Sequence, residues 1–126
     1  MGIPTKQRIR RAAEFRHVFA RGNRTTGVFA SIAAVQNGLP YSRFGLSVSK
    51  RVGNAVNRNL VKRRIRHALA DLEIAGGWDV VVTAKSPAAS VPYAMLDKTM
   101  QMSLERLGIR VNSPGANESA NSEVGE

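Results

Sequence analysis

The sequence predicts a single α+β domain in which helices pack on one β-sheet. The chain has 126 residues, a length that suits one domain. Its hydrophobic spacing changes along the chain in the order helix, two or three strands, helix, strand, helix. Apolar residues make up 43% of the chain and aromatic residues only 6%, so we expect a mainly aliphatic core.

The first predicted helix covers residues 12–21 and ends at Gly22, a natural helix terminator. Phe15, Val18 and Phe19 lie three and four residues apart within it. This spacing places the three side chains on one apolar face.

Two extended segments are predicted at residues 28–36 and 43–49. The second alternates large apolar residues with small ones, as a half-buried strand does. The turn sequence Asn-Gly-Leu-Pro lies between them, at residues 37–40. We therefore expect the two segments to pair as a hairpin.

A long central helix is predicted for residues 55–72, after Asn54 as its N-cap and before the glycine pair at 76–77. The residues of its core stripe are Val61, Ile65, Ala68, Leu69 and Leu72. The nearly continuous apolar run at 78–84 predicts a central strand, because such strands are buried on both faces. Residues 93–107 return to helical spacing and predict the last helix.

Charge is unevenly distributed along the chain, whose net charge is +10. Residues 113–126 hold three acidic residues and no basic one, so residues 1–112 hold 19 basic against six acidic residues, a net charge of +13. We assign residues 1–112 to one folded domain and expect the acidic tail at 113–126 to be disordered. Such self-repulsion in a small domain indicates a polyanionic partner.

Composition excludes several classes of protein. The chain has no cysteine, which excludes a disulfide framework and thiolate metal sites. The basic N-terminus lacks the apolar stretch of a secretory signal, and no segment reaches the roughly 18 apolar residues of a membrane span. We expect a soluble, cytoplasmic protein without a membrane partner.

Residues 50–67 form a strongly basic segment without any acidic residue. Cations recur every four residues on the predicted helix, so they share one ridge beside the core stripe. The residues of this cationic ridge and its flank are Arg58, Asn59, Lys62, Arg63 and Arg66.

The order of these charges disfavours the helix by itself. Like charges four residues apart repel each other by a few tenths of a kcal/mol per pair. A helix favours acids in its first turn and bases in its last, whereas here Arg58 and Lys62 come early and Asp71 comes at the end. Because a bound phosphate would reverse this penalty, the ridge indicates a nucleic-acid site rather than a solvated face.

A second basic cluster covers residues 6–24, with Glu14 as its one acid. Its helix carries Phe15 and Phe19. Aromatic rings beside cations suit single-stranded nucleic acid, whose bases stack while its phosphates pair with the cations. The sequence leaves open whether the two rings are core residues or line a cleft.

Catalytic residues are not evident. The two histidines, His17 and His67, lie in basic helices without a carboxylate at a suitable spacing. The six acids of residues 1–112 are scattered, and the glycines of residues 45–53 do not form a nucleotide-binding loop. We expect no catalytic residue, metal site or small-molecule cofactor in the protein.

The segment at residues 43–69, RFGLSVSKRVGNAVNRNLVKRRIRHAL, closely resembles the signature of the bacterial ribonuclease P protein subunit. Supporting pieces are EFRHVFARG near the start, WDVVVTAKSPAA and a final helix before the tail. The resemblance covers about residues 6–110, with all pieces in the right order.

This resemblance implies an α-β-β-β-α-β-α fold with a four-stranded sheet. It also implies a left-handed crossover between the strands at 43–49 and 78–84, although right-handed crossovers are the rule. The implied function is assistance to a catalytic RNA that removes the 5′ leader from precursor tRNA. The implied partners are that RNA and the single-stranded leader. Mg²⁺ belongs to the RNA, and the protein raises substrate and metal affinity.

The resemblance also implies three groups of RNA-contacting residues. The first group is the cationic ridge with its flank. Lys50, Arg51 and Asn54 lie in the loop that precedes the helix. Phe15 and Phe19 match aromatic residues of a cleft that receives the leader.

Two positions depart from the family pattern. Leu60 stands where the family commonly has arginine, so one cationic contact is missing, and Arg64 is a candidate replacement. Near Ile32 the family often has an aromatic residue in the cleft, so an aliphatic side chain puts one stacking contact in doubt.

Two other functions compete with this interpretation. The first is a ribosome-associated or RNA-chaperone protein of similar basic α+β fold. The second is a DNA-binding regulator that uses the helix at 55–72, which is disfavoured because no helix-turn-helix partner or dimer seam is evident. Acceleration of leader removal at low magnesium would separate them from the ribonuclease P function.

Overall fold

The computed structural model describes residues 3–111 and confirms the predicted α+β fold. The α-helices are α1 (Ala12–Arg21), α2 (Ala55–Asp71) and α3 (Tyr93–Arg106), and the strands are β1 (Asn23–Thr26), β2 (Ala30–Gln36), β3 (Arg43–Val48) and β4 (Trp78–Ala84). Short 3-10 turns occur at η1 (Thr5–Gln7), η2 (Lys50–Val52) and η3 (Ser86–Ala89). The expected acidic tail at 113–126 lies outside the described residues.

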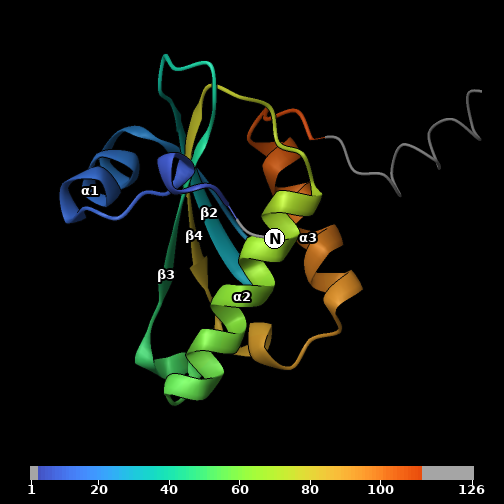
Figure 1. Cartoon of the computed structure of the whole chain (residues 1–126). Helices are drawn as coiled ribbons and strands as arrows, with labels where there is room; N and C mark the ends of the chain where they lie inside the picture. The colour runs from blue at the N-terminus through green and yellow to red at the C-terminus, as the bar shows by residue number, and fades with distance from the viewer. Residues whose placement is uncertain (1–2, 112–126) are drawn as a thin grey trace, which may run out of the picture.

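The four strands form one mixed sheet in the order β1-β2-β4-β3. β4 is central, antiparallel to β2 and parallel to β3. This position follows from its sequence, because the side chains of Val80, Val81 and Val82 are all fully buried and alternate between the two faces. Helix α1 covers one face of the sheet, and α2 and α3 cover the other (Figure 1).

The predicted hairpin between β2 and β3 is wrong, because β4 lies between them. The connection from β2 to β3 crosses β4 and so covers two strand spacings, about 10 Å. The six residues 37–42 span this distance easily. The apolar strand β4 is best placed with a paired strand on each edge. Pairing β2 directly with β3 would leave one edge of β4 without a hydrogen-bonding partner. Asn37 fixes the connection by donating a hydrogen bond from Nδ2 to Oδ1 of Asp79 at 2.9 Å.

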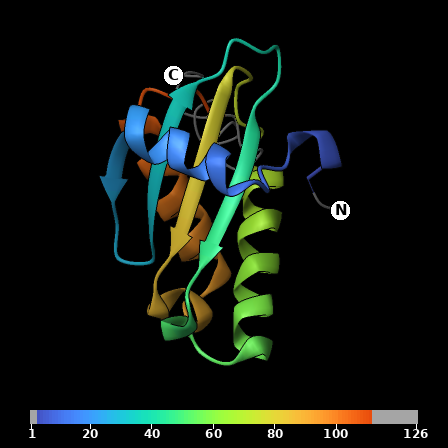
Figure 2. The ribbon, with the colours of Figure 1, turned by 90° about the vertical axis from the view of Figure 1, so that its left-hand side faces the viewer.

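The connection from β3 through α2 to β4 is left-handed. In Figure 2 both strands run downward, α2 returns behind the sheet, and β4 lies to the left of β3. General topology rules predict the right-handed form. The resemblance to the family therefore predicted the hand that the general rule did not.

The sequence did not predict the position of strand β1. It has four residues, Asn23–Thr26, which are polar and mostly exposed, so no hydrophobic alternation marks it. It forms by backbone pairing along the edge of β2, in register from Asn23 opposite Ala34 to Thr26 opposite Ser31. The strand predicted to begin at residue 28 begins at Ala30 instead.

Two clusters of buried side chains hold the layers together. The larger one joins the inner stripes of α2 and α3 to one face of the sheet. The smaller one joins α1 and the N-terminal segment to the other face, and its buried members are Ile9, Val18, Ala33 and Val81. Gly45 allows Phe15 to pack closely there, because a Cβ atom at this position would lie 2.8 Å from Cζ of Phe15 and would displace the ring.

Candidate nucleic-acid interface

The cationic ridge lies on α2 beside its buried stripe. The helix begins at Asn54, whose side-chain Oδ1 accepts a hydrogen bond from the backbone N–H of Asn57 at 2.9 Å. The buried stripe consists of Val61, Ile65, Ala68 and Leu69, followed by Leu72 at the C-cap. This anchoring leaves Arg58, Lys62 and Arg66 half-buried and Asn59 and Arg63 exposed.

No carboxylate of the protein neutralises this ridge within residues 3–111. The two salt bridges of this part of the chain both belong to Arg43, which contacts Glu14 and Asp79. The side chains of Arg58, Lys62 and Arg66 therefore form no salt bridge with this part of the chain. Helix α2 brings the predicted ridge together as a set of unpaired cations.

Arg64, which the sequence suggested as a replacement RNA contact, binds backbone carbonyls of the protein instead. Its Nη1 donates to the backbone carbonyls of Ala88 and Ala89 at 3.0 and 3.2 Å, and its Nη2 donates to the carbonyl of Val91. The guanidinium group therefore joins α2 to the turn before α3. It is not free to replace the cation missing at Leu60, whose own side chain is half-buried.

The loop before α2 places further candidates at the foot of the ridge. Lys50, Arg51 and Asn54 are all exposed there. The side-chain oxygen of Ser49 accepts from the backbone N–H of Arg51 at 3.3 Å. Gly53 turns the chain with φ of 144°, a conformation that L side chains rarely adopt.

Phe15 and Phe19 lie between the two alternatives that the sequence left open. Both rings pack on the smaller cluster, and both remain half-buried rather than fully buried. The guanidinium carbon of Arg24 lies 5.1 Å from the centroid of the Phe19 ring. Both rings thus have a packing role and remain partly exposed, and Phe19 also has a cation beside its ring.

Sequence analysis missed a row of hydroxyl side chains on the same face of the sheet. The row consists of Thr26, Ser31, Thr83 and Ser47, one from each strand, which are neighbours in the strand register. It lies two residues along the strands from the buried pair Ala33 and Val81. Figure 2 shows that α1 crosses only one end of this face, so the ends of β3 and β4 stay uncovered.

Ile32 does not belong to this face. Its side chain is 1% exposed and packs in the larger cluster, on the side of α2 and α3. Its neighbours Ser31 and Ala33 face α1 instead, because side chains alternate along a strand. Ile32 is therefore a core residue on the side of α2 and α3.

Arg43 joins α1 to the sheet through the two acids it contacts. Its Nε and Nη2 donate to the carboxylate of Asp79 at 2.8 and 2.5 Å, and its Nη1 donates to Glu14 at 3.2 Å. Burial favours a higher pKa for Asp79, but the hydrogen bonds from Arg43 and Asn37 outweigh it and lower the pKa. The hydrogen bond to Asp79 raises the pKa of Arg43.

This cluster makes folding sensitive to acid. A carboxyl group with a lowered folded-state pKa stabilises the fold above its ordinary pKa, and this stabilisation is lost as pH falls through the folded-state value. We expect Asp79→Asn to lower the free energy of unfolding at pH 7 by about 2 kcal/mol, the order of a hydrogen bond to a charged group. The deficit should shrink as pH falls below about 4, the ordinary range of Asp.

Urea unfolding of both proteins at pH 7 and near pH 3 measures this prediction. Glu105→Gln, at an exposed position on α3, is the matched control for the lost carboxylate. An Asp79→Asn deficit that stayed constant across this pH range would show that the carboxylate contributes through packing alone.

His17 and His67 are exposed, and the ring of His67 meets that of Tyr93 edge-on, with centroids 5.4 Å apart. Burial raises the pKa of Tyr93 to about 12, and burial followed by the charge of Asp71 raises the pKa of Asp97. Within residues 3–111, no three His, Cys, Asp or Glu side chains form a group that could hold a metal ion.

No helix in the described part of the chain is long and apolar enough to cross a membrane.

Comparisons with known proteins agree with this geometry. The Ribonuclease P family model matches residues 3–108. The chain is 40% identical over 111 residues to the ribonuclease P protein component of Bacillus cereus (strain 03BB102), covering 83% of this chain and 94% of that protein. It is 42% identical over 106 residues to the component of Geobacillus kaustophilus, covering 82% of this chain and 88% of that protein.

Solved structures show the same fold. A mutant of the Staphylococcus aureus RNase P protein with defective mRNA degradation activity has a TM-score of 0.75 at 26% identity, covering 83% of this chain and 91% of that one. The RNase P protein of Thermotoga maritima has a TM-score of 0.69, covering 79% of this chain and 96% of that one. Its identity of 24% supports the fold alone.

The fold and the unpaired cationic ridge define a small, basic α+β protein that binds RNA. The matched family model extends over most of the chain, and relatives near 40% identity carry one shared name. The chain belongs to the family of bacterial ribonuclease P protein components, as its signature segment predicted.

Proposed function

We propose that this protein assists a catalytic RNA in endonucleolytic removal of the 5′ leader from precursor tRNA. The observation that carries this proposal is the cationic ridge of α2, which the chain's own carboxylates leave unpaired within residues 3–111. Like charges held four residues apart are stabilised when a phosphate backbone lies against them.

Helix α2 and the preceding loop form the proposed contact with the catalytic RNA. The residues of this contact are Lys50, Arg51, Asn54, Arg58, Asn59, Lys62, Arg63 and Arg66. Guanidinium groups match phosphate oxygens in pairs, whereas Lys62 acts as a point charge. The asparagines add neutral donors that can reach ribose or base edges.

The face of the sheet beside α1 forms the proposed site for the leader. Phe15 and Phe19 offer partly exposed rings with which bases can stack. The hydroxyl row continues this surface beyond α1, and hydroxyl groups can both donate to phosphates and accept from ribose 2′-hydroxyls. Stacking and hydroxyl contacts tolerate varied sequences, as a single site that binds the leaders of different precursors requires.

Catalysis, in this proposal, is carried by the RNA together with its Mg²⁺ ions. The protein contributes positioning of the substrate and neutralisation of phosphates. Cations that pair with phosphates reduce the number of counterions that the folded RNA must recruit. We accordingly expect the protein to raise apparent metal affinity and to act in the cytoplasm.

Reconstitution with the cognate catalytic RNA tests this function. At low magnesium, added protein should accelerate leader removal from precursor tRNA, and the advantage should diminish as magnesium rises. Lys98 is an exposed cation on α3, so Lys98→Ala serves as a control. This variant should accelerate the reaction as the natural chain does. A protein that binds RNA but gives no acceleration at any magnesium concentration would instead support the ribosome-associated or RNA-chaperone function.

A further inference from the structure

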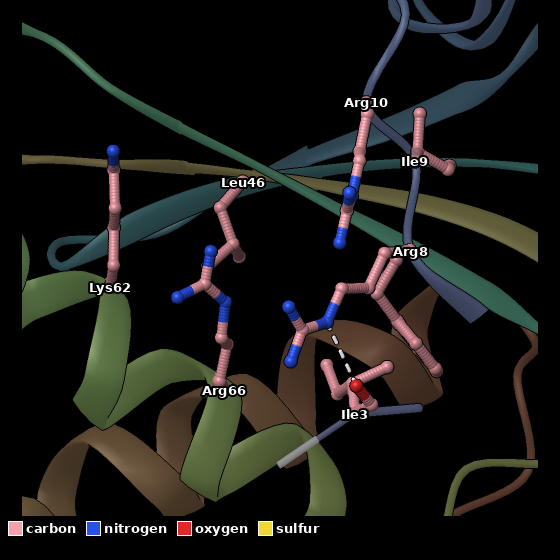
Figure 3. Close-up of a pocket in the computed structure, with 8 residues that line it drawn as sticks. Ile3, Arg8, Ile9, Arg10, Leu46, Lys62 and Arg66 are labelled. Atoms are coloured by element: carbon pink, nitrogen blue, oxygen red, sulfur yellow. Dashed lines mark hydrogen bonds between the residues drawn. The ribbon is translucent and has the colours of Figure 1, made fainter. Parts of the chain in front are cut away.

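A cavity of about 220 Å³ lies between the N-terminal segment, β3 and α2. Four cations line it: Arg8 and Arg10 from the N-terminal segment, and Lys62 and Arg66 from α2. These two pairs are more than 50 residues apart in the sequence. Figure 3 shows the guanidinium groups of Arg8, Arg10 and Arg66 pointing into the space between the two segments.

The edge of the sheet fixes the N-terminal pair. The backbone N–H of Ile9 donates to the carbonyl of Phe44 at 2.8 Å, and Arg8 forms a parallel bridge with the same residue. Ile9 packs in the cluster on the side of α1. Side chains alternate along an extended segment, so Arg8, which precedes Ile9, faces α2. Nε of Arg8 also donates to the carbonyl of Ile3 at 2.8 Å, which orients its guanidinium group.

The cavity has an apolar floor that strengthens its electrostatics. Ile3 and Phe44 are 5% and 8% exposed, and Leu46 is half-buried. Such a floor excludes water from one side of the cations, so their mutual repulsion is less screened than at an open surface. Between residues 3 and 111, no carboxylate forms a salt bridge with any of the four.

We propose that this cavity binds one phosphate group, held jointly by the N-terminal segment and α2. A tetrahedral oxyanion can accept from guanidinium groups on several sides, and its attraction to each of the four cations offsets their mutual repulsion. The occupant is a backbone phosphate of RNA, whose sugar can lie on the apolar floor. The choice of RNA as its source rests on the proposed function, whereas the phosphate site itself rests on the cavity.

The site adds Arg8 and Arg10 to an interface that the sequence assigned to α2 and its loop. It also gives the N-terminal segment a role, because one phosphate would clamp this segment against the helix. Removing a cation from either segment should therefore weaken the same binding event, and removing both should cost less than the product of the two single losses.

The first experiment titrates the full chain with inorganic phosphate at constant ionic strength, with chloride as the balancing anion. Amide shifts measured by NMR should saturate and should concentrate at Ile9, Leu46 and Arg66. Arg10→Gln and Arg66→Gln should each weaken binding about tenfold, the loss of one charge-assisted contact. Lys98→Gln removes the same charge from α3 and should leave binding within about twofold of the natural chain.

The second experiment measures binding of the catalytic RNA by the same variants and by the Arg10→Gln, Arg66→Gln double variant. A double loss smaller than the product of the single losses supports one shared RNA phosphate. Independent losses, together with saturable phosphate binding, would overturn RNA as the occupant and leave a site for free phosphate. Phosphate binding that does not saturate, or that Arg10→Gln and Lys98→Gln weaken equally, would overturn the site.

The two proposals can fail separately. Saturable phosphate binding that depends on Arg10 supports the site even if the protein does not accelerate leader removal. Acceleration of leader removal without such binding overturns the site and leaves the proposed function standing.

Discussion

Replacing Lys62 and Arg66 with alanine should flatten the salt dependence of RNA binding. Neutralisation of about six phosphates, at roughly 0.7 slope units each, predicts that the natural chain loses some 10²–10³-fold in affinity between about 50 and 200 mM salt. Each single substitution should lower that slope by up to about one unit, because each removes a cation that displaces counterions. The double variant should lower it further.

The structure makes this prediction specific to α2. Both side chains are half-buried beside the core stripe, and neither pairs with a carboxylate in residues 3–111, so alanine removes charge without releasing an internal partner. Lys98→Ala changes the net charge of the protein equally but should leave the slope nearly unchanged, since Lys98 lies on α3. Equal slopes for Lys62→Ala, Arg66→Ala and the natural chain would move the RNA surface away from α2.

Sequence predicted the cationic ridge because helical period alone decides which residues share a face. The bounds of α2, its N-cap at Asn54 and its buried stripe all follow from local spacing. Placement of Arg64 shows the limit of this reasoning. Its contacts are to Ala88, Ala89 and Val91, more than 20 residues away, and no local pattern indicates them.

Features that depend on strand order could not be predicted from the residues. A turn sequence after β2 suggested a hairpin, but the choice of neighbour was decided by the more apolar β4. The hydroxyl row has the same origin, because single serines and threonines on four strands become a row only in the observed register. The convergence of Arg8 with Arg66 likewise requires the N-terminal segment to bridge β3.

Phe19→Ala should weaken binding of leader-bearing precursor about tenfold while leaving binding of mature tRNA nearly unchanged. The ring is half-buried on the sheet and has the Arg24 guanidinium carbon 5.1 Å from its centroid, so we expect its exposed part to stack with a base beside a cation. Base–aromatic stacking contributes about 1–3 kcal/mol, which corresponds to this loss. Equilibrium binding of the two RNAs to the holoenzyme measures the difference.

Because Phe19 also packs on the smaller cluster, a second variant separates leader binding from stability. Thr83→Val keeps the shape of a half-buried side chain in the hydroxyl row and removes only its hydroxyl group. We expect it to weaken binding of leader-bearing precursor about fivefold, the order of one hydrogen bond, and to leave binding of mature tRNA unchanged. If Phe19→Ala weakened both RNAs equally and Thr83→Val weakened neither, the ring would belong to the core and the leader would lie elsewhere.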